Sequence, residues 1–195
     1  MTRGGSVTFW PMHDEVLAAA AAMLAQGLTT GTAGNVSARS GDTVVITASG
    51  EKTRTTTLAL DGTLLGGPDP SSERALHLAI YRAFPGVRAV VHAHPVYATA
   101  FACARRPIPV AVDEFALYAG GDVRCADYAM SGTEELAANA VAALDGRKAA
   151  LLANHGLVAV GDSPADALHV AGVVERGAHA IWAAEALGGA VPLTT

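Results

Sequence analysis

An apolar segment at residues 88–94 does most to limit the folds open to this chain. Its sequence is RAVVHAH, and Pro95 follows it, a residue that rarely continues a strand. A short apolar run bounded in this way is typical of a buried strand. Because a buried strand must be covered by other elements, the segment indicates a layered domain and not an isolated hairpin.

Periodicity and capping signals predict further elements on both sides of this strand. We expect helices at residues 12–26, 70–84, 96–104, 133–144 and 163–187, the second with a serine as its N-cap. We expect strands at residues 36–39, 43–47, 108–112, 115–118, 149–153 and 157–160, and a hairpin-like segment at 58–65. Strands and helices mixed in this order predict an α/β layered domain. Without a repeat or a dividing linker, we expect a flexible leader at residues 1–11 and one domain at 12–195.

Charge and hydropathy argue against two classes of partner. The formal net charge is −5 and no run of lysine and arginine occurs, so we expect no nucleic-acid partner. No apolar run approaches the roughly 20 residues of a membrane-spanning helix, so we expect no membrane partner. Two distant cysteines and no signal peptide predict reduced thiols and a cytoplasmic location. Only 16% of residues are charged, which suggests that other subunits cover part of the surface.

Histidines at the ends of expected strands predict a metal site. His92 and His94 are two residues apart on a strand, so their side chains leave the same face. Such a pair can also be solvated or packed in a core. His155, however, lies in the expected turn between two apolar strands, where a core histidine would be awkward. Three imidazoles at strand ends leave an open coordination position on a divalent cation, which is the arrangement of a catalytic site.

Three loops of small polar residues are candidates for binding an anion. Residues 32–35, 49–50 and 71–72 offer backbone N–H groups beside hydroxyl or amide side chains. The last pair lies at an expected helix start, where free N–H groups and the helix dipole favour a phosphate. Each loop could be an ordinary turn or cap, but three in one half of the domain favour a phosphate site. None contains lysine or arginine, so N–H and hydroxyl groups would be the donors.

Glu73 follows the third loop, in the first turn of the expected helix. A carboxylate there stabilises a helix by about 0.3–1 kcal/mol without any further role. It would also lie between the phosphate and metal sites, as a ligand or a general base. His77 could support it from the same helix face, although a packed core histidine is the simpler interpretation. Asp113 and Glu114 are expected in a loop, with a substrate role as the less favoured alternative.

Five short motifs in this order resemble the class II aldolase/adducin family. They are Gly34-Asn35-Val36-Ser37, Thr47-Ala48-Ser49-Gly50, Ser71-Ser72-Glu73, His92-Ala93-His94 and Asn154-His155-Gly156-Leu157. The resemblance covers residues 12–188, nearly the whole chain. It implies a central, mostly antiparallel sheet flanked by helical layers. It also implies a homotetramer with active sites at the subunit interfaces.

The resemblance further implies roles for individual residues. Zinc, or another divalent metal that accepts the same ligands, would be held by His92, His94, His155 and Glu73. Glu73 would also be the catalytic acid/base. The substrate phosphate would bind Asn35, Ser49, Gly50, Ser71 and Ser72, with Thr32 as a weaker candidate.

The activity implied is reversible cleavage of a ketose 1-phosphate to dihydroxyacetone phosphate and a short aldehyde. The substrate would be of the L-fuculose 1-phosphate or 5-deoxypentulose 1-phosphate type. An epimerase, dehydratase or decarboxylase with the same metal site is the alternative, and a non-catalytic adducin-like assembly module is less favoured. Glu73 favours the aldolase, because similar epimerases usually carry aspartate there.

The chain departs from the family's pattern at four places. Ala48 replaces a usual proline, a tyrosine expected near position 113 is absent, and so is an aromatic residue expected near Ser131. The family's C-terminal tail is missing after Thr195. These departures fall at the aldehyde end of the site, so the resemblance specifies the metal and the phosphate better than it specifies the aldehyde.

Overall fold

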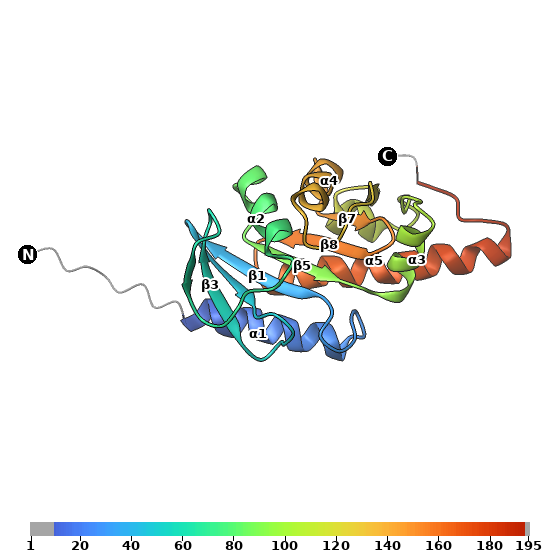
Figure 1. The fold of residues 1–195 in the computed structure, drawn as a ribbon. Helices are drawn as coiled ribbons and strands as arrows, with labels where there is room; N and C mark the ends of the chain where they lie inside the picture. The colour runs from blue at the N-terminus through green and yellow to red at the C-terminus, as the bar shows by residue number, and fades with distance from the viewer. Residues whose placement is uncertain (1–9, 194–195) are drawn as a thin grey trace, which may run out of the picture.

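A twisted eight-stranded sheet forms the middle layer of the computed structural model, which describes residues 10–193 (Figure 1). The strand order is β4-β3-β2-β1-β5-β8-β7-β6. The strands are β1 (Asn35–Ser40), β2 (Thr43–Thr47), β3 (Thr55–Ala59), β4 (Leu64–Gly66), β5 (Ala89–Ala93), β6 (Arg124–Ala126), β7 (Ala149–Leu152) and β8 (Gly156–Gly161). All neighbours pair antiparallel except β6 and β7, which are parallel. The predicted α/β domain with a mostly antiparallel central sheet is therefore confirmed.

Helices cover both faces of this sheet. They are α1 (Trp10–Ala25), α2 (Arg74–Ala83), α3 (Val96–Cys103), α4 (Glu134–Leu144) and α5 (Pro164–Ala184), with short helical turns η1 (Phe115–Ala119) and η2 (Glu185–Leu187). In Figure 1, α2 and α4 lie on one side of the sheet, and α1 and α5 lie on the other. Successive strand residues serve opposite layers: Val90 packs in the core under α2 and α4, and Val91 packs in the core under α1, α3 and α5. No helix among the described residues is both long and apolar enough to cross a membrane.

The central strands bring distant parts of the chain to one end of the sheet. β5 is antiparallel to both β1 and β8, so its C-terminal end lies beside the first residues of those two strands. Asn35 is opposite His92 in this register, and Leu157 is opposite Ala93. The turn from β7 to β8 lies at the same end because β7 and β8 are also antiparallel. The two histidine motifs therefore meet there.

Gly34 lets the chain enter β1 close to β5. Its φ is +75°, and a Cβ atom there would lie 2.7 Å from the carbonyl oxygen of His92. A left-handed backbone and a contact of this length both favour glycine, the residue without a Cβ atom.

Two helix starts differ from their predicted positions. α1 begins at Trp10, two residues before the expected Met12, and the rest of the expected leader, residues 1–9, lies outside the described residues. α2 begins at Arg74, and its N-cap residue is Glu73, not a serine. The hydroxyl of Ser71 accepts a hydrogen bond from the Glu73 N–H at 3.2 Å instead. Glu73 therefore precedes the first helical turn, and the prediction that it lies within that turn was wrong.

The region between α3 and α4 also differs from its prediction. Of the strand expected at 108–112, only an isolated bridge between Ile108 and Val123 forms. Residues 115–118 are not a strand but part of the π-helical turn η1, where the ring of Phe115 packs against Gly177 of α5. The short strand β6 was not predicted. Short apolar runs do not distinguish a strand from a helical turn, because both bury the same side chains.

Candidate metal centre and active site

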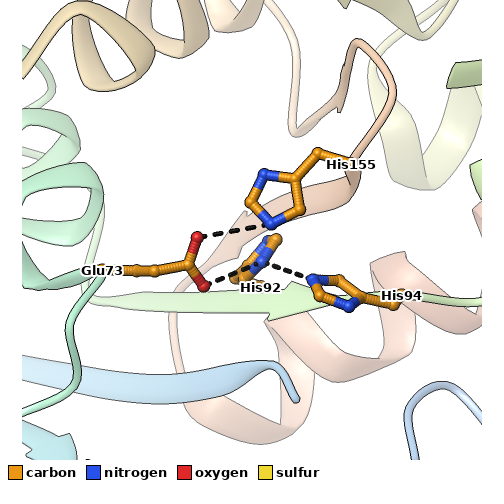
Figure 2. A group of neighbouring side chains, drawn as sticks. All are labelled: Glu73, His92, His94 and His155. Carbon is orange, nitrogen blue, oxygen red and sulfur yellow. Dashed lines mark hydrogen bonds and ion pairs between the residues drawn. The ribbon is translucent and has the colours of Figure 1, made fainter. Parts of the chain in front are cut away.

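Four side chains converge at the end of the sheet where the histidine motifs meet (Figure 2). Glu73, His92, His94 and His155 each offer one ligand atom, and these atoms all lie within 4.8 Å of one another. Glu73 precedes α2, His92 lies in β5, His94 follows the end of β5, and His155 lies in the turn between β7 and β8. The structure therefore brings together all four residues that the sequence marked as metal ligands.

The backbone sets the tautomer of His92, which is fully buried. Its Nδ1 atom lies 2.9 Å from the carbonyl oxygen of Leu157. A carbonyl can only accept, so Nδ1 carries a proton and Nε2 is the ring nitrogen that faces the cluster. That Nε2 atom lies 2.9 Å from Nε2 of His94 and 3.0 Å from Oε2 of Glu73. A histidine held this way by a carbonyl is the usual form of a metal ligand.

The turn that carries His155 packs closely against the end of β5. A Cβ atom at Gly156 would lie 2.5 Å from the carbonyl oxygen of Ala93 and 2.7 Å from Cδ2 of His94. Asn154 takes the left-handed conformation, with φ of 56°, which asparagine adopts more readily than most residues. Gly156 therefore provides the close approach, and His155 Nε2 reaches to within 3.4 Å of Glu73 Oε1.

The charge states of these groups suit a cation. Burial opposes ionisation of Glu73, but the hydrogen bond and charge of His92, with His155 and Ser131, outweigh it and hold the Glu73 pKa well below its usual range. Burial lowers the pKa of His94 to about 4, and it also lowers the pKa of His155. An ionised carboxylate beside the unprotonated rings of His94 and His155 is the form in which these ligands bind a metal. The donor set of three imidazole nitrogens and one carboxylate therefore fits a divalent cation.

Asn35 connects Glu73 to a buried chain of polar side chains. Its Nδ2 donates to Oε2 of Glu73 at 3.0 Å, and its Oδ1 accepts from Nε2 of His77. Nδ1 of His77 lies 2.6 Å from the hydroxyl of Ser37, which lies 2.7 Å from the hydroxyl of Tyr81. Burial lowers the pKa of His77 to about 3, so the ring is neutral. His77 is thus both buried and linked to Glu73, the role that the sequence favoured less.

Two of the loops expected to bind phosphate lie side by side. The N–H of Ser71 donates to the carbonyl oxygen of Thr47 at 3.2 Å, and the N–H of Ser49 donates to the carbonyl oxygen of Asp69 at 2.9 Å. The Ser49 N–H is therefore already used, and its hydroxyl is the remaining donor. Of the expected phosphate residues, Asn35 and Ser71 are buried, whereas Thr32, Ser49, Gly50 and Ser72 are exposed.

A family model covers most of the chain. The model described as the Class II Aldolase and Adducin N-terminal domain matches residues 14–182. The chain belongs to the class II aldolase and adducin family.

Individual members of this family are similar along most of their length. The chain is 42% identical over 162 residues to 5-methylthioribulose-1-phosphate/5-deoxyribulose-1-phosphate aldolase of Rhodospirillum rubrum, covering 80% of this chain and 73% of that protein. It is 43% identical over 155 residues to L-fuculose phosphate aldolase of Escherichia coli O6:H1, covering 76% of this chain and 72% of that protein. A solved structure of L-fuculose 1-phosphate aldolase superposes with a TM-score of 0.92 at 34% identity, covering 98% of this chain and 94% of that chain.

Lys52 is a feature of this class II aldolase-family chain that the sequence analysis missed. Its Nζ atom donates to the carbonyl oxygens of Thr32, Ala33 and Gly34 at 3.0, 2.6 and 2.9 Å. A cation therefore lies against the first of the expected phosphate loops, although no lysine belongs to the loops themselves. The one sequence feature that could have indicated this role is the position of Lys52, two residues after Gly50 of the second expected phosphate loop.

Of the residues expected at the aldehyde end of the site, Ser131 contacts the cluster, whereas Asp113 and Glu114 do not. Ser131 Oγ donates to Oε1 of Glu73 at 2.9 Å, a contact that no local pattern indicated. Asp113 and Glu114 lie outside the four-residue cluster. Glu114 instead lies 3.8 Å from Arg176 of α5, with the Arg176 side chain largely exposed and the Glu114 side chain partly exposed.

Proposed function

We propose that this chain is a metal-dependent aldolase that reversibly cleaves a ketose 1-phosphate to dihydroxyacetone phosphate and a short aldehyde. The cluster of Glu73 with three histidines is the observation that carries the proposal. The similar aldolases act on L-fuculose phosphate and on 5-deoxyribulose and 5-methylthioribulose 1-phosphates by name. We therefore propose a substrate of one of these types.

We propose that His92, His94, His155 and Glu73 hold a zinc ion. When bound, the cation supplies a Lewis acid that draws electron density from the substrate carbonyl and so eases cleavage of the adjacent C3–C4 bond. The protein's part is to keep the imidazoles of His94 and His155 unprotonated through burial and to orient the ring of His92 through the carbonyl oxygen of Leu157.

Glu73 is proposed as the acid/base that acts at C3. In cleavage the C4 hydroxyl becomes an aldehyde and the electron pair of the broken C3–C4 bond stays on C3. The ionised Glu73 takes up the proton released from the C4 hydroxyl and delivers it to C3, and in condensation its carboxylate removes the proton from C3 and returns it to the C4 oxygen. Asn35 and Ser131 each donate to a different oxygen of Glu73, at 3.0 and 2.9 Å. These two contacts orient the carboxylate, and a fixed orientation is what efficient proton transfer needs.

The substrate phosphate is proposed to bind Asn35, Ser49, Gly50, Ser71 and Ser72, with a smaller contribution from Thr32. The phosphate is remote from the reacting carbons, so its binding energy serves to position them. The exposed hydroxyls of Ser49 and Ser72 support this assignment.

The proposed assembly is a homotetramer in the cytoplasm, with active sites at the subunit interfaces. Several large apolar side chains support an interface because they are exposed in the single chain, among them Leu117, Tyr128, Met130 and Trp182. The low charged fraction of 16% agrees with it.

A screen of ketose 1-phosphates tests the proposed reaction. Metal-loaded protein should release dihydroxyacetone phosphate from L-fuculose 1-phosphate, 5-deoxyribulose 1-phosphate or a close analogue. An epimerase or dehydratase would return products with all substrate carbons still joined, and a decarboxylase would release carbon dioxide. Either outcome without dihydroxyacetone phosphate would replace the aldolase assignment, and metal binding with no turnover would favour a non-catalytic module.

A further inference from the structure

Lys52 is a buried ammonium group without a carboxylate partner. Only 9% of the residue is exposed, and its three N–H bonds match the three carbonyl oxygens of residues 32–34. Within the described part of the chain, no carboxylate lies within 4.0 Å of Nζ. Burial lowers the pKa of Lys52, as expected for a cation that lacks a counter-charge. A charge buried in this way is unfavourable unless something offsets it.

The position of Lys52 indicates what that counter-charge is. It follows Ser49 and Gly50 by two residues, and it holds the loop that leads into Asn35. Lys52 thus ties together two of the three loops proposed to hold the phosphate. Its charge is also close enough to His94 to contribute to the lowered pKa of that imidazole.

Lys52 also orients the peptide groups of residues 32–35. The carbonyl of Ala33 points at Nζ and also accepts from the hydroxyl of Thr29 at 2.6 Å. In a planar trans peptide the N–H points opposite to the carbonyl, so the Gly34 N–H faces away from Lys52. Among the described residues, this N–H has no hydrogen-bond acceptor. The Ala33 N–H is used by the carbonyl oxygen of Thr30 at 3.1 Å, so the Gly34 N–H is the backbone donor of this loop that, backed by the Lys52 cation, suits an anion.

We propose that Lys52 is the cationic element of the phosphate subsite and that a phosphate monoester dianion is its counter-charge. Its three donors are occupied, so it acts on the phosphate through its charge and through the orientation of the loop, as a positioning residue. The inference rests on the proposed function only for the identity of the sugar, because phosphate binding can be measured without turnover.

Variants at Lys52 separate its charge from its packing. Lys52→Met and Lys52→Gln remove the charge, the latter keeping a donor, and Lys52→Arg keeps the charge. Lys148→Met is the matched control. Lys148 is exposed and directly precedes β7, whereas His155 follows the opposite end of that strand. Inorganic phosphate is the probe, with its affinity measured by calorimetry on metal-loaded protein. Loss of the charge should weaken phosphate binding by about tenfold or more, and Lys52→Arg should retain most of it.

Enzyme kinetics should also separate the neutral variants from Lys52→Arg. The KM for the ketose phosphate should rise with the phosphate Kd in both neutral variants, while kcat changes by less than about threefold, as expected for lost uniform binding. A folded Lys52→Met or Lys52→Gln protein with wild-type phosphate affinity would overturn the proposal.

A measurement on the wild-type chain needs no neutral variant to fold. The sequence contains only two lysines, so protein labelled with carbon-13 at lysine Cε gives two NMR signals, which Lys148→Arg assigns. Added phosphate should shift the Lys52 signal saturably and leave the Lys148 signal in place. No shift while phosphate binds, or no phosphate binding at all, would overturn the role of Lys52. If these results hold but no ketose phosphate is cleaved, the aldolase assignment fails and the phosphate subsite stands.

Discussion

The side-chain amide of Asn35 donates to Oε2 of Glu73 at 3.0 Å, joining the first residue of β1 to the residue before α2. The other end of the same amide accepts from His77. The carboxylate can only accept, so the amide nitrogen faces Glu73 and the amide oxygen accepts from His77. Rotating the amide by 180° would therefore break both hydrogen bonds. The carboxylate of Glu73 is therefore held in one orientation by the fold itself.

Glu73→Gln should separate catalysis from binding. The amide has the same shape but cannot exchange the proton, so turnover should fall by roughly 10²–10⁴-fold while the fold and most substrate affinity remain. If Glu73 only stabilised the start of the helix, its replacement would lower the free energy of unfolding by at most about 1 kcal/mol and leave turnover nearly intact. Rates are compared at equal metal occupancy, with Glu134→Gln in the first turn of α4 as the control. A near-wild-type rate in Glu73→Gln would move the assignment to another group, such as Asp113 or Glu114.

Removal of any one histidine should remove metal and activity together. We expect about one divalent ion per chain, bound through His92, His94 and His155. Elemental analysis of the three alanine variants should give reduced metal content, and chelation of the wild type should abolish turnover until metal is restored. His169→Ala, an exposed histidine of α5, should behave as wild type. Full metal occupancy in His155→Ala would remove that residue from the site.

Acid should destabilise the metal-free protein partly through His77. The His77 pKa is about 3 in the fold against 6.5 for a free histidine, so the unfolded chain binds more protons between these values. Stability is therefore fully present above about pH 6.5 and declines as pH falls towards 3, by about 1.4 kcal/mol for each pKa unit separating the two states. Urea unfolding from pH 7 to 4 should give a shallower decline in His77→Gln. Parallel declines in the two proteins would contradict a neutral buried His77.

Gly34→Ala should cost more stability than Gly31→Ala. Both glycines have positive φ, +75° and +55°, so alanine is strained at either position. Only at Gly34 would the new Cβ also approach the carbonyl oxygen of His92, at 2.7 Å, whereas nothing lies within 4 Å at Gly31. We expect a loss of about 1–3 kcal/mol or more at Gly34 and about 1 kcal/mol at Gly31 from urea unfolding. Equal losses would mean that the approach of β1 to β5 is not tight.

Sedimentation should detect a tetramer. The exposed apolar side chains would be buried between subunits, so the tetramer should persist at the concentrations used for assays. Dilution should reduce specific activity only where it also dissociates the assembly. A stable monomer with full activity would rule out active sites shared between subunits.

The sequence by itself determined which four residues are candidate metal ligands, and it predicted most element boundaries to within a few residues. His92 and His94 alternate on a strand and must leave the same face, and the expected position of His155 in a turn followed from the apolar runs around it. The helices expected from residues 133 and 163 also begin there, with the side chains of Thr133 and Ser163 as their N-caps, because a cap is made within one helical turn. These features are local, so the period of the side chains and the chemistry of a few neighbours are sufficient to predict them.

Tertiary structure alone decided which side chains surround those ligands. Lys52 bonds to Thr32 across 20 positions, and Asn35 reaches Glu73 across 38 positions. Such contacts depend on strand register and on how helices pack over the sheet, neither of which a local pattern contains. For the same reason the segment 115–118 became a helical turn under α5 instead of a strand. Its apolar residues required burial, and only the packing against Gly177 determined the backbone that achieves it.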